Sequence, residues 1–157
     1  MFFRYRSIME TKNDIHEMRR SLAAVFCQTC FALMLFFIGG LIYIVFRAET
    51  IRMFIWADYL GLSNWVNRIR TLCEDIYVND FIRYSVPDGL WLLAYLLIID
   101  IIWNESNIFK TAFIYVLPII AILLEFMQLF GLFHGVFDIY DLISYFGALL
   151  IYKLLKI

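Results

Sequence analysis

The feature of this sequence that most constrains its fold is an apolar run long enough to cross a lipid bilayer. Residues 22–46 form 25 consecutive positions at which Gln28 and Thr29 are the only strongly polar side chains. As an α-helix the run is about 37 Å long, which exceeds the roughly 30 Å hydrocarbon core of a membrane. The run is too long for the apolar core of a signal peptide and lacks a small-residue cleavage pattern, so we expect it to be retained.

The whole chain is unusually apolar for its 157 residues. Hydrophobic residues make up 64% of it and charged residues 17%, whereas soluble domains have roughly 45–50% and about 25%. A soluble fold of this size needs more polar surface, so the composition excludes one. The two prolines and seven glycines exclude a low-complexity chain. The net charge of −1 gives no electrostatic reason to expect nucleic acid as a partner.

Three more apolar segments follow in the second half of the chain. Pro87 and Asp88 suit the first turn of one of them, because proline lacks the N–H that would be unpaired there and a carboxylate complements the helix dipole. Pro118 predicts a kink in the next. The sequence therefore predicts an all-α, polytopic membrane protein with short interfacial helices. Its single membrane domain, 1–157, comprises an N-terminal cytoplasmic segment, 1–20, an outer interfacial loop, 47–85, and four transmembrane helices, 22–46, 86–103, 111–130 and 137–155.

Two local patterns concern the first helix. Ser7 and Glu10 have the spacing of a capping box, which predicts a helix that starts near Ile8 and continues into the membrane segment. Gly39 and Gly40 either allow another helix to approach closely or are simply tolerated in a membrane helix, and we favour tolerance.

The loop 47–85 combines arginines and carboxylates with apolar residues at helical spacing. Tryptophan and tyrosine are typical of helices that lie in the membrane interface. We therefore expect Trp56 and Trp65 to lie at the membrane surface or over the mouth of the helix bundle. A freely solvated loop is the alternative.

The distribution of lysine and arginine predicts the orientation. With the N-terminus in the cytoplasm, eight basic residues lie on the inner side and five on the outer side. Because basic residues concentrate on the cytoplasmic side of membrane proteins, we expect both termini inside.

Polar side chains within the predicted spans are the candidate site. Glu125 and Gln128 share one face of the third span. A short turn makes the third and fourth spans antiparallel neighbours, so this face of the third span can meet the start of the fourth. The start of the second span can lie at the same level and join the site. Ionisable groups inside a membrane are costly and usually functional. The predicted ligand-binding residues are Glu125, Gln128, Asp138, Asp141, Asp88 and Tyr145, whereas Asp100 lies apart, near the inner end.

Structural explanations compete with this site. Asp138 and Asp141 could instead be solvated residues of a first helical turn, where the helix dipole favours a carboxylate. Glu125 and Gln128 could instead form only hydrogen bonds between helices. The chain lacks the serine-hydrolase, zinc-protease and phosphate-loop motifs, so we expect no enzyme, no cofactor and no catalytic residue. A metal site with His134 lacks a recognised motif. Cys27 and Cys30 form a CxxC inside an apolar run, where we expect inert thiols.

One family resemblance emerges from the same residues. Glu125-Phe-Met-Gln128, then Gly135-Val-Phe-Asp138-Ile-Tyr-Asp141 and Tyr145-Phe-Gly147, resemble the motifs of VanZ-like membrane proteins, and Ser85-Val-Pro-Asp88 resembles the acidic start of that family's preceding span. An arginine frequent between the glutamine and the aspartates is absent here, and Tyr145 stands near a common asparagine. The resemblance implies a four-span protein of the bacterial cytoplasmic (inner) membrane, in a family named for a member linked to glycopeptide resistance.

The sequence leaves three classes of function open. The favoured one is a non-enzymatic envelope protein that binds a polar or cationic head group, of a lipid, glycan or glycopeptide-related molecule, in the outer leaflet. The second is a small oligomeric channel or transport element that passes protons or cations. The third is a structural subunit of a larger membrane complex. The expected partners are accordingly membrane lipids, a lipid-linked glycan or glycopeptide, and a second copy or another membrane protein.

Overall fold

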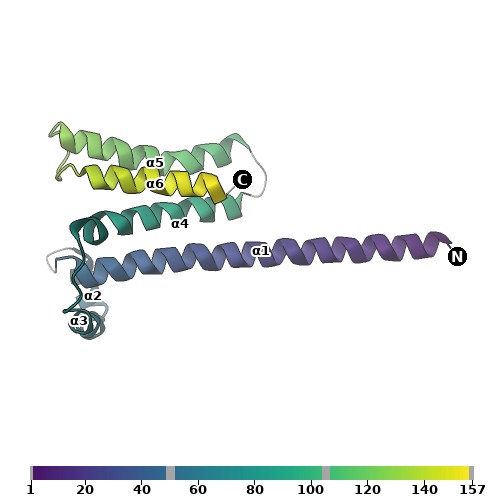
Figure 1. Cartoon of the computed structure of the whole chain (residues 1–157), viewed down its shortest axis with the longest axis horizontal. Coiled ribbons are helices and arrows are strands. Elements are labelled where there is room, and N and C mark those ends of the chain that lie inside the picture. Colours follow the sequence, from purple (N-terminus) through teal and green to yellow (C-terminus); the bar gives the residue numbers. More distant parts are fainter. Residues whose placement is uncertain (1, 49–51, 104–106, 156–157) are drawn as a thin grey trace.

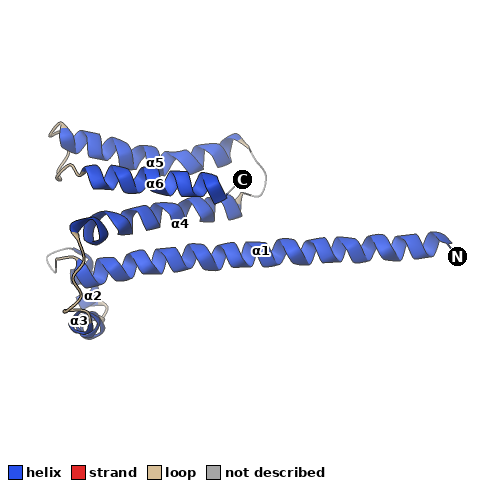
Figure 2. Ribbon diagram, viewed as in Figure 1, coloured by secondary structure: helices blue, strands red, loops and turns tan. Residues whose placement is uncertain are grey.

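The chain folds into helices joined by short connections. The computed structural model describes residues 2–48, 52–103 and 107–155, with side chains from residue 22 onward. No strand occurs in these ranges, so the all-helical prediction is confirmed for them. Figures 1 and 2 show the helices α1 (Phe2–Phe46), α2 (Arg52–Tyr59), α3 (Ser63–Leu72), the π-helix η1 (Phe81–Ser85), α4 (Val86–Ile102), α5 (Ile108–Leu129) and α6 (Ile139–Leu155).

Among the residues that the structure describes, three segments are long and apolar enough to cross a membrane. They are Leu22–Phe46 in α1, Phe81–Ile102, which joins η1 to α4, and Ile108–Leu129, which is α5. These segments indicate a membrane-embedded protein. Helix α6 is shorter, with 17 residues, and covers most of the predicted fourth span, 137–155.

Helix α4 lies at the centre of the fold. It packs against α1 on one side and against α5 and α6 on the other (Figure 1). Five of its buried side chains, Leu92, Leu93, Ala94, Leu96 and Leu97, make up half of the hydrophobic core cluster found among the described residues. Pairs of leucines four residues apart keep this face apolar along the helix, so the middle of the bundle contains hydrocarbon side chains.

Two glycines allow helices to approach α4 closely. A Cβ atom at Gly39 would lie 2.8 Å from Nε1 of Trp91, whereas one at Gly40 would meet nothing within 4 Å. Our interpretation of Gly39 as merely tolerated is therefore wrong, because Trp91 of α4 occupies the space that a side chain at position 39 would need. A Cβ atom at Gly89 would likewise lie 3.0 Å from the Cβ and carbonyl oxygen of Ser144 on α6.

The first helix is longer than its sequence pattern predicts. It begins at Phe2, so the expected start near Ile8 is wrong and Ser7 lies inside the helix. The capping-box spacing misleads here because an uninterrupted helix can continue through it. The N-terminal part of α1 extends well past the other helices (Figure 1).

The segment between α1 and α4 gathers at one end of the bundle. Helix α3 packs against α1, and α2 packs against α3 (Figure 2). Nη1 of Arg70 donates hydrogen bonds to the carbonyl oxygens of Ile44 and Arg47, at 2.8 and 2.9 Å, and so satisfies the last turn of α1. Trp56 and Trp65 are 64% and 66% exposed, and their location at the membrane surface stays a prediction.

Candidate functional site

Three carboxyl side chains from three helices converge at one end of the bundle. Asp88 lies in the first turn of α4 and Asp141 in the first turn of α6, while Glu125 lies in the last turn of α5. Each of the three is close enough to interact electrostatically with another. We call Asp88, Glu125 and Asp141 the carboxyl cluster. The short connection between α5 and α6 and the central position of α4 bring these residues together.

Glu125 connects the end of α5 to the start of α6. Its side chain is 5% exposed, and its Oε2 atom accepts a hydrogen bond of 3.2 Å from the backbone N–H of Asp138. Asp138 in turn accepts a hydrogen bond of 2.9 Å from the N–H of Tyr140 through its Oδ1 atom. Asp138 therefore caps the start of α6, which is the structural role that its sequence position also allowed.

Three buried polar atoms in and beside the cluster, Arg47 Nε, Ser85 Oγ and Asp141 Oδ1, form no hydrogen bond of normal geometry in the described part of the chain. Ser85 is completely buried, and its side chain lies beside the carboxyl group of Asp141. Within the described part of the chain, Ser85 Oγ and Asp141 Oδ1 form no hydrogen bond of normal geometry, although the Ser85 hydroxyl is close enough to donate to the Asp141 carboxyl group. Such atoms are costly in an apolar environment, and a bound polar group would satisfy them. Ser85 also ends a π-helix, a rare element that is frequent at functional sites.

Arg47 supplies a positive charge that the sequence analysis did not include in the site. It interacts electrostatically with Asp88 and Asp141. Its Nη2 atom donates a hydrogen bond of 3.1 Å to the carbonyl oxygen of Tyr84, and its guanidinium carbon lies 5.0 and 4.9 Å from the ring centroids of Tyr43 and Tyr84. Arg47 directly follows the run 22–46, so the sequence alone could have placed it at the end of the bundle that also holds Asp88.

The remaining predicted residues divide into two groups. Tyr145 lies within electrostatic range of all three members of the carboxyl cluster. Gln128 instead lies against the connection between α5 and α6, where a Cβ atom at Gly135 would be 2.6 Å from its Cδ atom. Gly135 also has a φ of +147°, which favours glycine. The structure therefore brings together Asp88, Glu125, Asp141 and Tyr145, with Asp138 at the edge and Gln128 on the turn.

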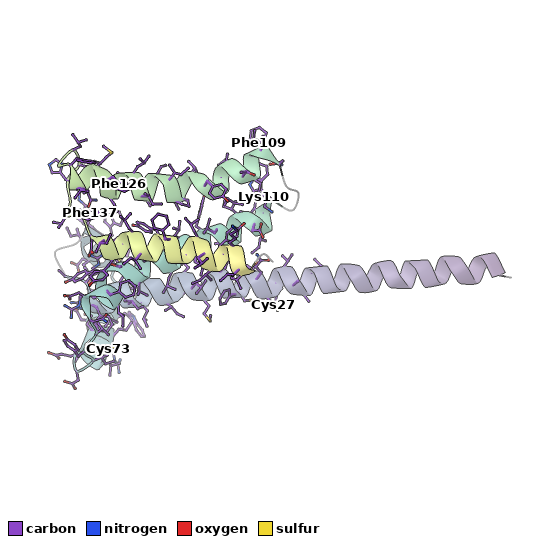
Figure 3. All side chains as sticks on the ribbon, turned by 45° about the horizontal axis from the view of Figure 1, so that its top comes forward. Cys27, Cys73, Phe109, Lys110, Phe126 and Phe137 are labelled. Carbon is purple, nitrogen blue, oxygen red and sulfur yellow. The ribbon has the colours of Figure 1, made fainter. Side chains whose placement is uncertain are left out.

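A second charged group lies at the opposite end of the bundle. Nζ of Lys110 lies 2.7 Å from Oδ1 of Asp100, and the two side chains are 9% and 17% exposed. The hydroxyl of Tyr152 donates a hydrogen bond of 3.3 Å to the same carboxyl group. Lys110 is far from Phe126 and Phe137, which neighbour Glu125 and Asp138 in sequence (Figure 3). We call Asp100, Lys110 and Tyr152 the lysine network.

Sequence reasoning missed the lysine network. It left Lys110 between the predicted spans 86–103 and 111–130, but Asn107 caps α5 by accepting a hydrogen bond of 2.8 Å from the N–H of Lys110. The helix therefore begins at Ile108, and Lys110 lies in its first turn. The N-cap preference of asparagine was the signal that could have placed this boundary.

The described geometry also bears on whether the site could hold a metal ion. Across the residues that the structure describes, no group of three His, Cys, Asp or Glu side chains is arranged to hold a metal ion. Cys27 and Cys30 are exposed on α1. Comparison of the chain with protein-family models, curated proteins and solved structures yields no match.

Proposed function

We propose that this chain is a VanZ-like, multi-pass protein of the bacterial cytoplasmic membrane that binds a cationic head group at the carboxyl cluster. The observation that carries the proposal is an excess of negative groups together with a buried polar atom that lacks a normal hydrogen bond. The carboxyl cluster holds three carboxyl groups, of which Asp88 and Asp141 interact with the guanidinium of Arg47, and Asp141 Oδ1 is buried without a hydrogen bond of normal geometry in the described part of the chain. A ligand with an ammonium group supplies both the missing charge and the missing hydrogen-bond donors.

In this proposal α6 is a fourth transmembrane helix. Its 17 residues extend about 26 Å as an α-helix, and the bilayer accommodates small mismatches by local thinning. Both termini are cytoplasmic, as the excess of basic residues favours. The carboxyl cluster then lies in the outer leaflet, where a lipid or a lipid-linked glycan can present its head group from the side.

The distribution of polar groups favours binding over transport. A channel for protons or cations needs polar groups along its length. Between the carboxyl cluster and the lysine network, α4 instead presents the buried leucines of the core, including Leu93, Leu96 and Leu97. The carboxyl cluster is therefore separated from the lysine network by apolar side chains of α4, which favours a binding site at one end of the bundle over a transport path through it.

The head-group proposal is tested with a matched pair of soluble lipids. We expect the protein in dodecyl maltoside to bind dihexanoylphosphatidylethanolamine and to bind its N-acetylated form at least about tenfold more weakly, because acetylation removes the ammonium charge. Asp141→Asn should remove this preference. Asp75→Asn, which changes an exposed carboxyl group outside the cluster, should retain it. Equal calorimetric affinities of the wild-type protein for the two lipids would contradict the proposal.

The orientation is tested by labelling single cysteines in intact cells. Val136 is 87% exposed next to the cluster, so Val136→Cys, made after Cys27, Cys30 and Cys73 are replaced by serine, should react with a membrane-impermeant maleimide. Ser7→Cys should not react until the membrane is permeabilised. Gly135 is unsuitable for labelling because its φ and its contact with Gln128 disfavour a side chain. Reversed labelling would contradict the outer-leaflet site.

A further inference from the structure

A polar cavity whose lining shares no residue with the carboxyl cluster lies where the end of α1 meets α3 and η1. Its volume is about 560 Å³, which is within the range of small-ligand pockets. The polar residues that line it are Asn67, Arg70, Thr71, Glu74 and Arg83. None of them belongs to the carboxyl cluster, so the cavity calls for a separate explanation.

Arg83 carries the main unsatisfied group of this cavity. Its Nε atom is buried and makes no hydrogen bond within the described part of the chain. The guanidinium carbon lies 5.8 Å from the ring centroid of Tyr84, a contact that stabilises positive charge but accepts no hydrogen bond at Nε. An Nε donor without an acceptor is costly, and because this atom is shielded from solvent, an anion in the cavity would neutralise the guanidinium by pairing with its terminal nitrogens.

Arg70 adds a second positive charge that is held in place. Its Nη1 atom donates to two carbonyl oxygens at the end of α1, and its guanidinium carbon lies 5.2 Å from the ring centroid of Phe54. These contacts fix the side chain before any ligand binds, which lowers the entropy cost of binding. Among the described residues of the lining there are two guanidinium groups and one carboxylate, from Glu74, so this part of the lining is net positive.

We propose that this cavity binds a phosphate group, with Arg83 as the principal ligand and Arg70 as a fixed second charge. The planar guanidinium matches the oxygen geometry of a phosphate and pairs with two oxygens at once. Asn67 and Thr71 add polar groups from α3, whereas Glu74 opposes the anion. The phosphate is supplied either by a phospholipid, since the cavity adjoins a membrane-spanning helix, or by free phosphate in solution.

Calorimetry in dodecyl maltoside separates these sources and tests the site. Inorganic phosphate and dihexanoylphosphatidylglycerol are titrated into the wild-type protein, and saturable binding of at least one is expected. Binding of the lipid alone identifies a phosphodiester head group as the ligand, and binding of both identifies the phosphate itself. Arg83→Gln should weaken binding at least about tenfold, because it removes a charged hydrogen-bond donor. Arg68→Gln removes an exposed arginine of α3 that does not line the cavity and should leave the affinity unchanged.

A variant with the opposite effect distinguishes a phosphate site from general loss of structure. Glu74→Gln removes the carboxylate from the lining and should strengthen binding several-fold. If Arg83→Gln loses helicity in circular dichroism, Arg83→Lys is compared instead, and it should weaken binding because lysine lacks the paired donors. The absence of saturable binding by the wild-type protein, or unchanged affinity in both the Arg83 and the Glu74 variants, overturns the proposal. The preference for a free ammonium group at the carboxyl cluster is a separate measurement, so either proposal can fail without the other.

Discussion

The two ends of the helix bundle bury charged groups in different ways. In the lysine network, Asp100 has a lysine at 2.7 Å and a tyrosine hydroxyl at 3.3 Å. In the carboxyl cluster, Asp88 and Asp141 share one guanidinium, from Arg47, and Asp141 Oδ1 forms no hydrogen bond of normal geometry in the described part of the chain. Buried charges that serve stability are paired. The lysine network is thus a buried ion pair that joins α4 to α5 and α6, whereas the carboxyl cluster retains the unpaired atom on which our ligand-site proposal rests.

Helix α4 carries one member of the carboxyl cluster and one member of the lysine network, so the two groups can be compared within the same bundle. Both groups contact the same central helix, through Asp88 in its first turn and Asp100 near its last turn. Matched substitutions at the two ends therefore perturb the same bundle and can be compared directly as changes in the free energy of unfolding.

The largest effect is expected at the lysine network. Lys110→Met leaves Asp100 buried without its cation, and breaking a buried ion pair costs about 3–5 kcal/mol. Lys153→Met changes an exposed lysine of α6 and should stay within about 0.5 kcal/mol of the wild type. Unfolding in mixed micelles measures both. If Lys110→Met lowers the free energy of unfolding by less than about 1 kcal/mol, the lysine network stabilises the fold no more than the carboxyl cluster does.

The next effect concerns the packing that brings the carboxyl cluster together. Gly89→Leu places a side chain where α4 meets Ser144, and overpacking of this kind costs about 1–3 kcal/mol. It should also separate Asp88 from Asp141 and weaken ammonium binding. Gly147→Ala adds a methyl group that meets nothing within 4 Å and should be neutral or slightly stabilising. Equal unfolding free energies for these two variants would show that α4 and α6 need no close approach.

A smaller effect is expected at Glu125. Glu125→Leu removes the acceptor of the Asp138 N–H, and leaving that donor unpaired costs about 1–2 kcal/mol. Glu125→Gln retains an acceptor oxygen and should unfold with nearly the wild-type free energy, while its ammonium binding falls. A neutral Glu125→Leu variant with unchanged ammonium binding would make the cluster incidental and favour a structural subunit.

Much of the helical layout could be predicted from the sequence, because apolar runs report directly on membrane-length helices. The predicted second span, 86–103, compares with α4 at Val86–Ile102, and the third, 111–130, with α5 at Ile108–Leu129. Asp88, Glu125 and Asp141 could be grouped because each lies next to a helix end at one level of the bundle. Such placement needs only helix lengths and short connections.

The partners of these residues could not be predicted in the same way. Arg47 reaches Asp88 and Asp141 only because α1 packs beside α4, which depends on the contact between Gly39 and Trp91. Lys110 reaches Asp100 because α5 begins at Ile108, a boundary set by the Asn107 cap. Lateral packing and single-residue helix boundaries depend on side-chain contacts that an apolar pattern does not encode.

The most direct test of the central claim is the unfolding free energy of Asp141→Asn with and without dihexanoylphosphatidylethanolamine. If the carboxyl cluster is a ligand site, Asp141→Asn without lipid unfolds like the wild type, because asparagine removes a like charge from the cluster and keeps its shape. At a lipid concentration about 100 times the dissociation constant, the wild type should gain about 2.7 kcal/mol and the variant nearly nothing. A variant destabilised as strongly as Lys110→Met, together with a wild type that the lipid does not stabilise, would contradict the account.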